Sequence, residues 1–392
     1  MKRLKTELNA LVNRGVDRHL RLAVTGLSRS GKTAFITALV NQLLNIHTGA
    51  RLPLLSAARE ERLLGVKRVP QRDFGIPRFT YDEGLAQLYG QPPMWPTPTR
   101  GVSEIRLALR YRSNDSLLRH FKDTSTLYLE IVDYPGEWLL DLPMLAQDYL
   151  SWSRQMTGLL QGQRAEWSAR WRQLCAGLDP LAPADEARLA DIAAAWTDYL
   201  HACKREGLHF IQPGRFVLPG EMAGAPALQF FPWPDVDAVG EAKLAQADKH
   251  SNAGMLRERY KYYCEKVVKG FYKEHFLRFD RQIVLVDCLQ PLNSGPQAFN
   301  DMRLALTQLM QSFHYGQRTL FRRLFSPVID KLLFAATKAD HVTVDQHSNM
   351  VSLLQQLIQD AWQNAAFEGI SMDCLGLASI QATQSGLIEV NG

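Results

Sequence analysis

A glycine-rich segment near the N-terminus constrains this chain more than any other feature. Residues 26–33 read Gly-Leu-Ser-Arg-Ser-Gly-Lys-Thr and fit the phosphate-binding pattern Gly-x-x-x-x-Gly-Lys-[Ser/Thr] without a mismatch. An apolar run, residues 21–25, precedes the segment, and a helix-competent stretch, residues 33–44, follows it. Because a P-loop connects a strand to a helix, this context predicts a nucleotide-binding P-loop.

Each residue type in the loop has a predicted task. The glycines let the backbone curl so that N–H groups face phosphate oxygens, and the helix presents its positive dipole end to the same anion. We expect Lys32 to reach the β- and γ-phosphates and Thr33 to bind Mg²⁺ through its hydroxyl. The predicted nucleotide-binding residues of this segment are Gly26, Ser28, Arg29, Ser30, Gly31, Lys32, Thr33 and Ala34.

A second motif, Asp-Tyr-Pro-Gly at residues 133–136, follows the apolar run 127–132. At the end of a strand, the Asp133 carboxylate can hold magnesium and the Gly136 N–H can face the γ-phosphate. Glu137 follows Gly136, and its negative charge is unfavourable beside a phosphate. We therefore expect slow hydrolysis, with Lys32, Gly136 and Glu137 as the catalytic residues.

The third magnesium ligand is expected in the long connection before the second strand. Thr80, Thr97 and Thr99 all lie there, and Thr99 is nearest the start of that strand. We predict that Thr99 binds magnesium together with Thr33 and Asp133. Pro96 and Pro98 stiffen this segment, so an anchoring role is the alternative.

The base site is predicted at Thr-Lys-Ala-Asp, residues 337–340, which follows another apolar run. The Asp340 carboxylate can accept both guanine donors, N1–H and the 2-amino group, whereas adenine has neither. Lys338 can lay its methylene stem over the base. Ser379 and Ile380 are the remaining candidates, through backbone contacts to the base oxygen.

Apolar runs of strand length alternate with stretches of helical spacing, which predicts an α/β fold with helices on both faces of a mostly parallel P-loop NTPase sheet. The predicted strands are 21–25, 102–109, 127–132, 283–286, 332–335 and 374–379, and the predicted helices are 33–44, 299–325 and 351–366. We expect an N-terminal amphipathic helix (1–20), a first G-domain part (21–141), an all-helical insertion (142–279) and a second G-domain part (280–392). The region 49–99 reads as a polar connection.

The ends and the charge of the chain limit its partners. The helix predicted for residues 1–20 has a basic face, and we favour its packing on the core over peripheral contact with an anionic membrane. No run of about 18 apolar residues and no signal peptide is present, so a cytoplasmic protein is expected. Five scattered cysteines suit buried thiols in a reducing compartment. A net charge of +5 makes a nucleic-acid partner improbable.

The predicted insertion is rich in aromatic residues. Residues 255–279 interleave basic and aromatic side chains, as single-stranded nucleic-acid sites do. Acidic residues dilute that charge, so we favour packing of the insertion on its core. Trp152, Trp167, Trp171 and Trp196 are interpreted first as the insertion's own core and second as a surface for a protein partner.

In this order, the four motifs resemble the G motifs of Ras-like and translation-factor GTPases. Against those motifs, Glu137 replaces the usual water-orienting Gln, and Thr337 replaces the usual Asn, which weakens the expected selectivity for guanine. More narrowly, Gly-Leu-Ser-Arg-Ser-Gly-Lys-Thr, Asp-Tyr-Pro-Gly-Glu-Trp and Thr-Lys-Ala-Asp-His, with the helical insertion, resemble the YcjX-like family of bacterial stress-associated P-loop proteins. The resemblance implies a GTP- and Mg²⁺-binding cytosolic protein in a stress-related process, with an unidentified protein partner.

Three hypotheses about function follow. The first is slow GTP hydrolysis, with the nucleotide state coupled to the insertion. The second is a nucleotide-dependent interaction module with negligible turnover. The third, a small-molecule kinase, lacks an acceptor base and an arginine-rich lid, and it leaves Asp340 without a role.

Overall fold

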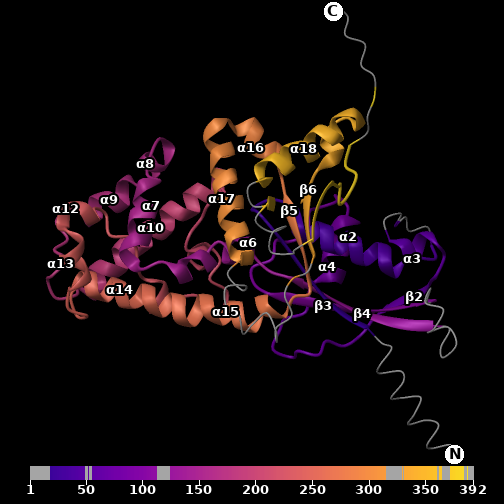
Figure 1. Ribbon diagram of the computed structural model, residues 1–392, viewed down its shortest axis with the longest axis horizontal. Coiled ribbons are helices and arrows are strands. Elements are labelled where there is room, and N and C mark those ends of the chain that lie inside the picture. The colour runs from indigo at the N-terminus through magenta and orange to yellow at the C-terminus, as the bar shows by residue number, and fades with distance from the viewer. Residues whose placement is uncertain are drawn as a thin grey trace, which may run out of the picture.

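A seven-stranded sheet occupies one half of the molecule (Figure 1), in the order β2-β3-β4-β1-β5-β6-β7. The strands are β1 (Arg18–Gly26), β2 (Leu63–Arg68), β3 (Ser103–Arg112), β4 (Thr124–Asp133), β5 (Arg281–Val286), β6 (Lys331–Ala336) and β7 (Ser371–Gly376). Strands β4, β1, β5, β6 and β7 are parallel, and β3 pairs antiparallel with both β2 and β4. The predicted α/β class with a mostly parallel sheet is confirmed.

The computed structural model describes residues 18–48, 52, 55–112, 124–314, 329, 331–359, 362–363, 371–383 and 386. Most of the predicted N-terminal helix, residues 1–17, lies outside this set. Residues 18–20 were wrongly assigned to that helix, because they begin β1 and Leu20 pairs with Leu129 of β4. Pairing with a neighbouring strand supplies the backbone hydrogen bonds that helical spacing alone does not predict.

The region 49–99 is more ordered than the predicted polar connection. It contains α3 (Ser56–Arg59), β2 and α4 (Tyr81–Leu88). Strand β2 is an edge strand, and its burial falls from Leu63 at its start to exposure at Arg68. An edge strand with one solvated side needs few apolar residues, so its sequence signal was weak.

The two faces of the sheet bury different cores. In β1, the side chains of Ala23 and Val24 point to opposite faces, as successive strand residues must. Val24 lies in the core covered by α2 (Lys32–Leu44), and Ala23 lies in the core shared with α17 (Pro296–His314). Helices α16 (Leu289–Ser294) and α18 (His347–Leu357) complete the layers. The predicted end of α17 lies outside the described residues.

From 142 to 279 every regular element is helical, and this insertion forms the other half of the molecule (Figure 1). Its elements are η1 (Leu142–Ala146), α7 (Tyr149–Gly158), α8 (Gln163–Trp167), α9 (Ala169–Cys175), α10 (Glu186–Arg205), α11 (Gly214–Val217), η2 (Gly220–Met222), η3 (Pro226–Leu228), α12 (Val236–Val239), α13 (Glu241–Ala245), α14 (Asn252–Tyr262), a π-helical segment (Tyr263–Val268), α15 (Lys269–Glu274) and η5 (Phe276–Arg278).

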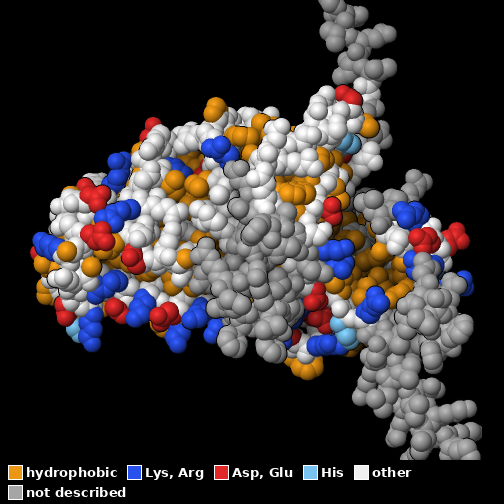
Figure 2. Space-filling model, in the orientation of Figure 1, with side chains coloured by type: hydrophobic (Ala, Val, Ile, Leu, Met, Phe, Trp, Pro, Cys, Tyr) orange, Lys and Arg blue, Asp and Glu red, His pale blue; other side chains and the backbone are white. Residues whose placement is uncertain are grey.

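Most aromatic residues of the insertion form its core, as predicted, but Trp167 is only partly buried and Tyr262 is 52% exposed. Trp152, Trp171 and Trp196 are fully buried, and Tyr263 and Phe271 of the return segment are buried with them. This core is continuous with the Ala23 face of the sheet. On the insertion's visible surface, basic and acidic side chains are mixed (Figure 2), so no single-sign stripe is present on that face.

Two further predictions can be compared with the structure. Cys175, Cys203, Cys264 and Cys288 are buried free thiols, and Cys374 is half-buried. Among the described residues, no helix has both the length and the apolar character needed to cross a bilayer.

Candidate functional site

The predicted P-loop forms the turn between β1 and α2. Gly31 has φ +79° at the helix start, where a side chain would be strained, and Arg29 also has a positive φ. No side chain caps α2, and its first turn carries no acidic residue. The first N–H groups of a helix have no partners within it, so this end is suited to an anion.

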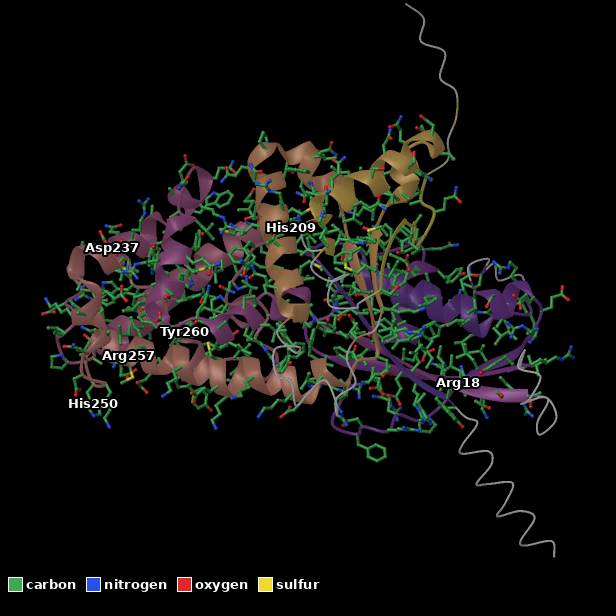
Figure 3. All side chains as sticks on the ribbon, in the orientation of Figure 1. Arg18, His209, Asp237, His250, Arg257 and Tyr260 are labelled. Atoms are coloured by element: carbon green, nitrogen blue, oxygen red, sulfur yellow. The ribbon has the colours of Figure 1, made fainter. Side chains whose placement is uncertain are left out.

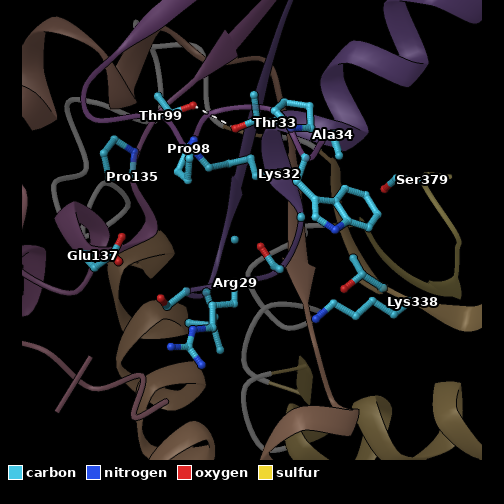
Figure 4. Close-up of a pocket in the computed structure, with 18 of the residues that line it drawn as sticks. Arg29, Lys32, Thr33, Ala34, Pro98, Thr99, Pro135, Glu137, Lys338 and Ser379 are labelled. Carbon is cyan, nitrogen blue, oxygen red and sulfur yellow. Dashed lines mark hydrogen bonds between the residues drawn. The ribbon is translucent and has the colours of Figure 1, made fainter. Parts of the chain in front are cut away.

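Four predicted residues from three segments converge beside the loop. The Oγ1 atoms of Thr33 and Thr99 are 3.3 Å apart (Figure 4). The Thr99 hydroxyl donates to Asp133, and the Lys32 ammonium pairs with the same carboxylate. Hydroxyl and carboxylate oxygens suit Mg²⁺, which takes its remaining ligands from phosphates and water. Thr33, Thr99 and Asp133 can therefore hold the ion that the sequence predicts.

Of the three threonines considered for this position, the structure brings Thr99 to the cluster. Thr97 instead accepts a hydrogen bond from the Gln87 side chain, at 3.0 Å. Thr80 occupies the N-cap position of α4. Thr99 is thus the one of the three that contacts Thr33 and Asp133.

Gly136 and Glu137 begin α6 (Gly136–Leu139), directly after Asp133-Tyr-Pro. A Cβ on Gly136 would overlap the carbonyl oxygen of Gly26, so only glycine allows this approach to the P-loop. Glu137 is buried, and its Oε1 lies 2.7 Å from Nζ of Lys204 on α10. An insertion residue is thus paired with the residue beside the phosphate site.

The predicted base site is built from the ends of β5, β6 and β7. Nζ of Lys338 lies 2.5 Å from Oδ2 of buried Asp287, and Oδ2 of Asp340 accepts from the Ala382 N–H at 2.9 Å. The Thr337 hydroxyl donates to the Val286 carbonyl at 3.4 Å, which joins β6 to β5. Asp287 was not predicted, because no motif marks a carboxylate one residue after β5.

One cavity of about 900 Å³ contains both predicted subsites, and its size suits a nucleotide-sized ligand. The predicted residues that line it are Gly26, Ser28, Arg29, Ser30, Gly31, Lys32, Thr33, Ala34, Thr99, Glu137, Lys338, Asp340, Ser379 and Ile380. Asp133 and Gly136 are joined to it through the contacts described above. The predicted last strand, 374–379, extends too far, because β7 ends at Gly376 and both Ser379 and Ile380 follow it.

Apart from Thr99, the residues of two other walls of the cavity were missed by sequence reasoning. The segment 95–100 lines it through Trp95, Pro96, Pro98, Thr99 and Arg100, and the insertion lines it through His201, Lys204, Arg205 and Leu218. Burial lowers the pKa of His201, and the nearby Lys204 lowers it further. The prolines were the only sequence signal for the segment 95–100. The insertion residues had no such signal, because residues on helix surfaces far along the chain belong to no motif.

The fold and the cavity define a P-loop protein of α/β class with a large helical insertion. The chain belongs to the YcjX-like family, DUF463, which matches residues 20–392. It is 91% identical over 392 residues to "Ras-like GTPase YcjX" of Escherichia coli (strain K12), covering 100% of this chain and 84% of that protein. It is 47% identical over 398 residues to "Ras-like GTPase YcjX" of Shewanella oneidensis (strain MR-1), covering 99% and 82%. The resemblance inferred from the motifs is confirmed.

Proposed function

We propose that this protein binds GTP and GDP with Mg²⁺ and hydrolyses GTP slowly. The observation that carries the proposal is a single cavity with Lys32 at one side and Asp340 at the other. The names of the two similar proteins agree with it. The proposed nucleotide-binding residues are Gly26, Ser28 to Ala34, Lys338, Asp340, Ser379 and Ile380, all of which line the cavity, and the proposed magnesium ligands are Thr33, Thr99 and Asp133.

The preference for guanine is proposed from Asp340. Its carboxylate lies at the cavity wall in a loop joined to the segment after β7 by the Ala382 and Ala339 backbone bonds. A carboxylate held in this way can accept from both donors of a guanine edge. An adenine edge would leave it facing an acceptor, and an unmatched buried polar group is strongly disfavoured.

The slow rate is proposed from Glu137, a carboxylate beside the expected γ-phosphate position. The alternative is an interaction module with negligible turnover, which the existing ion pair between Glu137 and Lys204 favours. Single-turnover hydrolysis of bound GTP distinguishes the two, because the module would retain GTP.

We propose further that the nucleotide state is coupled to the insertion through residues 136–141. Trp138 Nε1 donates to the Leu218 carbonyl at 3.0 Å, and the Arg215 guanidinium lies 3.3 Å from the centre of the Trp138 ring. The Asp141 carboxylate accepts from the Gly214 N–H at 2.8 Å. A shift of residues 136–141 would therefore change their contacts with α11 and the residues beside it. The insertion would present the surface for an unidentified protein partner in a stress-related process.

The test is a comparison of GTP, GDP and ATP binding to the intact protein, with Mg²⁺ and with a chelator. We expect both guanine nucleotides to bind, ATP to bind at least roughly tenfold more weakly, and the chelator to weaken GTP binding. Equal affinity for ATP and GTP would contradict guanine specificity, and no binding of either would remove the proposed function.

A further inference from the structure

We propose that Lys204, on α10 of the insertion, is a second phosphate-binding cation: it leaves Glu137 and contacts the γ-phosphate when GTP is bound. The inference rests on the proposed function and adds a catalytic residue from outside the G motifs. In this view the insertion completes the active site, in addition to responding to it.

The first observation is that the end of α10 is fixed to the P-loop. Nη2 of Arg29 donates to the carbonyl oxygen of Arg205, the last residue of α10, at 2.8 Å. The last carbonyls of a helix lack partners within it and carry partial negative charge, so the Arg29 guanidinium is a favourable ligand for them. The residue before Arg205 is therefore held next to the phosphate loop.

The second observation is where the Lys204 side chain ends. Its Nζ lies 2.7 Å from Oε1 of Glu137, and Gly136 is in contact with Gly26 of the P-loop. Both Lys204 and Glu137 line the cavity that contains Lys32. The Lys204 ammonium is thus already at the wall of the phosphate subsite, and no movement of the helix is needed to bring it there.

The third observation concerns charge. In the described structure both cavity lysines of the phosphate side are neutralised by carboxylates, Lys32 by Asp133 and Lys204 by Glu137. A triphosphate brings more negative charge than either carboxylate, and Glu137 is unfavourable beside it. The Lys204 side chain is 25% exposed and has a flexible stem, so it can exchange one anion for the other.

The exchange gives each residue a role in hydrolysis. Lys204 stabilises the charge on the γ-phosphoryl group, and the released Glu137 carboxylate accepts a hydrogen bond from the attacking water. The water oxygen bonds to the γ-phosphorus while the bond from that phosphorus to the β,γ-bridging oxygen breaks, and its electron pair leaves with GDP. The water proton passes to Glu137 and then to the released phosphate.

Arg205 also lines the cavity but is the weaker candidate. Its side chain is 70% exposed and lies 3.7 Å from the carboxylate of Glu206, its neighbour in the chain. Its fixed contribution is the backbone carbonyl that Arg29 binds. An Arg205→Met variant therefore tests whether the cation is assigned to the right residue.

The experiment compares Lys204→Met, Arg205→Met and a control, Lys243→Met, which changes an exposed lysine on α13 of the same insertion. Affinities for GDP and for a non-hydrolysable GTP analogue are measured with single-turnover GTP hydrolysis. For Lys204→Met we expect hydrolysis to fall roughly 100-fold. We also expect a loss of analogue affinity with GDP affinity unchanged. Lys243→Met should resemble the parent protein, and Arg205→Met should lose less hydrolysis than Lys204→Met does.

A Glu137→Gln variant distinguishes phosphate contact from a merely structural ion pair. It leaves Lys204 available, so analogue affinity should be kept or increased while hydrolysis falls. If Lys204→Met and Glu137→Gln change both nucleotide affinities alike, or if Lys204→Met behaves as Lys243→Met does, the proposal is overturned. Loss confined to Arg205→Met overturns the assignment to Lys204. Failure of the parent protein to bind or hydrolyse GTP would instead refute the proposed function.

Discussion

Arg164 of the insertion and Asp301 of α17 form a buried ion pair across 137 positions of sequence, with Nη2 2.5 Å from Oδ1 and each side chain 7% exposed. The other oxygen of Asp301 accepts from the backbone N–H groups of His209 and Phe210, at 2.5 and 3.0 Å. His209 is labelled beside α17 in Figure 3. One carboxylate therefore joins two segments of the insertion to the helix that covers the sheet.

Asp301→Ala should reduce the free energy of unfolding by about 3–5 kcal/mol, because the buried Arg164 guanidinium would lose its only carboxylate partner among the described residues and keep only neutral ones. Chemical denaturation measures the change. The matched control is Asp198→Ala, which removes the exposed pair of Asp198 with Arg170 and should change stability by less than about 1 kcal/mol. Similar effects of the two substitutions would mean that the buried pair does not hold the insertion.

Stability should also depend on the protonation of Asp141. Burial raises the pKa of Asp141 to about 7, although the Tyr263 hydroxyl and the Gly214 N–H donate to its carboxylate. In the unfolded chain an Asp has a pKa of about 3.9. The folded state thus binds the proton more tightly than the unfolded chain does. The resulting contribution to the free energy of unfolding is complete below about pH 4 and is lost as the pH rises through about 7.

Asp141→Asn keeps the shape of the side chain and removes the titration. We expect the parent protein to lose more unfolding free energy than the variant between about pH 5 and pH 7.5, by an amount on the order of 2 kcal/mol. Denaturation curves at both pH values provide the comparison. Parallel losses in the two proteins would show that Asp141 is ionised throughout.

Lys32→Ala should weaken GTP and GDP binding roughly 100-fold, since a charge-assisted contact to phosphate is lost. Calorimetric titration with Mg²⁺ gives the affinities. Lys67→Ala, at an exposed position of β2, is the control and should bind as the parent does. Unchanged affinity in Lys32→Ala would remove the P-loop assignment.

Asp340→Asn should weaken the binding of guanine nucleotides roughly tenfold or more and strengthen the binding of xanthine nucleotides. The 2-oxo group of xanthine needs a donor, which the Asn amide supplies, and the remaining oxygen can still accept from Ala382. Competition between GTP and XTP for the variant measures the change. A variant that still prefers GTP as strongly as the parent would place the base elsewhere.

Coupling predicts that the insertion shifts with the nucleotide. Spectroscopic labels at the exposed positions Ala194 on α10 and Gln356 on α18 report the distance between the insertion and the G-domain part. We expect different distance distributions with GDP and with a non-hydrolysable GTP analogue, because residues 136–141 contact α11. The same labels in Lys32→Ala should give one distribution. Coinciding distributions in the parent would make the insertion a static platform.

Local chemistry made the phosphate and base motifs readable in the sequence. Gly31, Lys32 and Thr33 are adjacent, and a strand, a tight turn and a helix are formed by neighbours in the chain. Parallel strands place their carboxyl ends at one edge of a sheet, so residue order alone was enough to assign Asp133 and Asp340 to the same side of the fold. The spacing of the P-loop residues and the position of the two carboxylates at strand ends can both be read directly from the order of residues.

Tertiary contacts decided the rest. The pairs Glu137–Lys204 and Lys338–Asp287 join residues 67 and 51 positions apart. Strand β2 likewise depends on pairing with β3, and residues 18–20 on pairing with β4. Such contacts form when elements that are far apart in the sequence pack together, and the residue pattern of one segment does not indicate which other segment it will contact. The sequence by itself thus determined which residues are proposed to bind a nucleotide, while packing of the insertion decided which cation stands opposite Glu137.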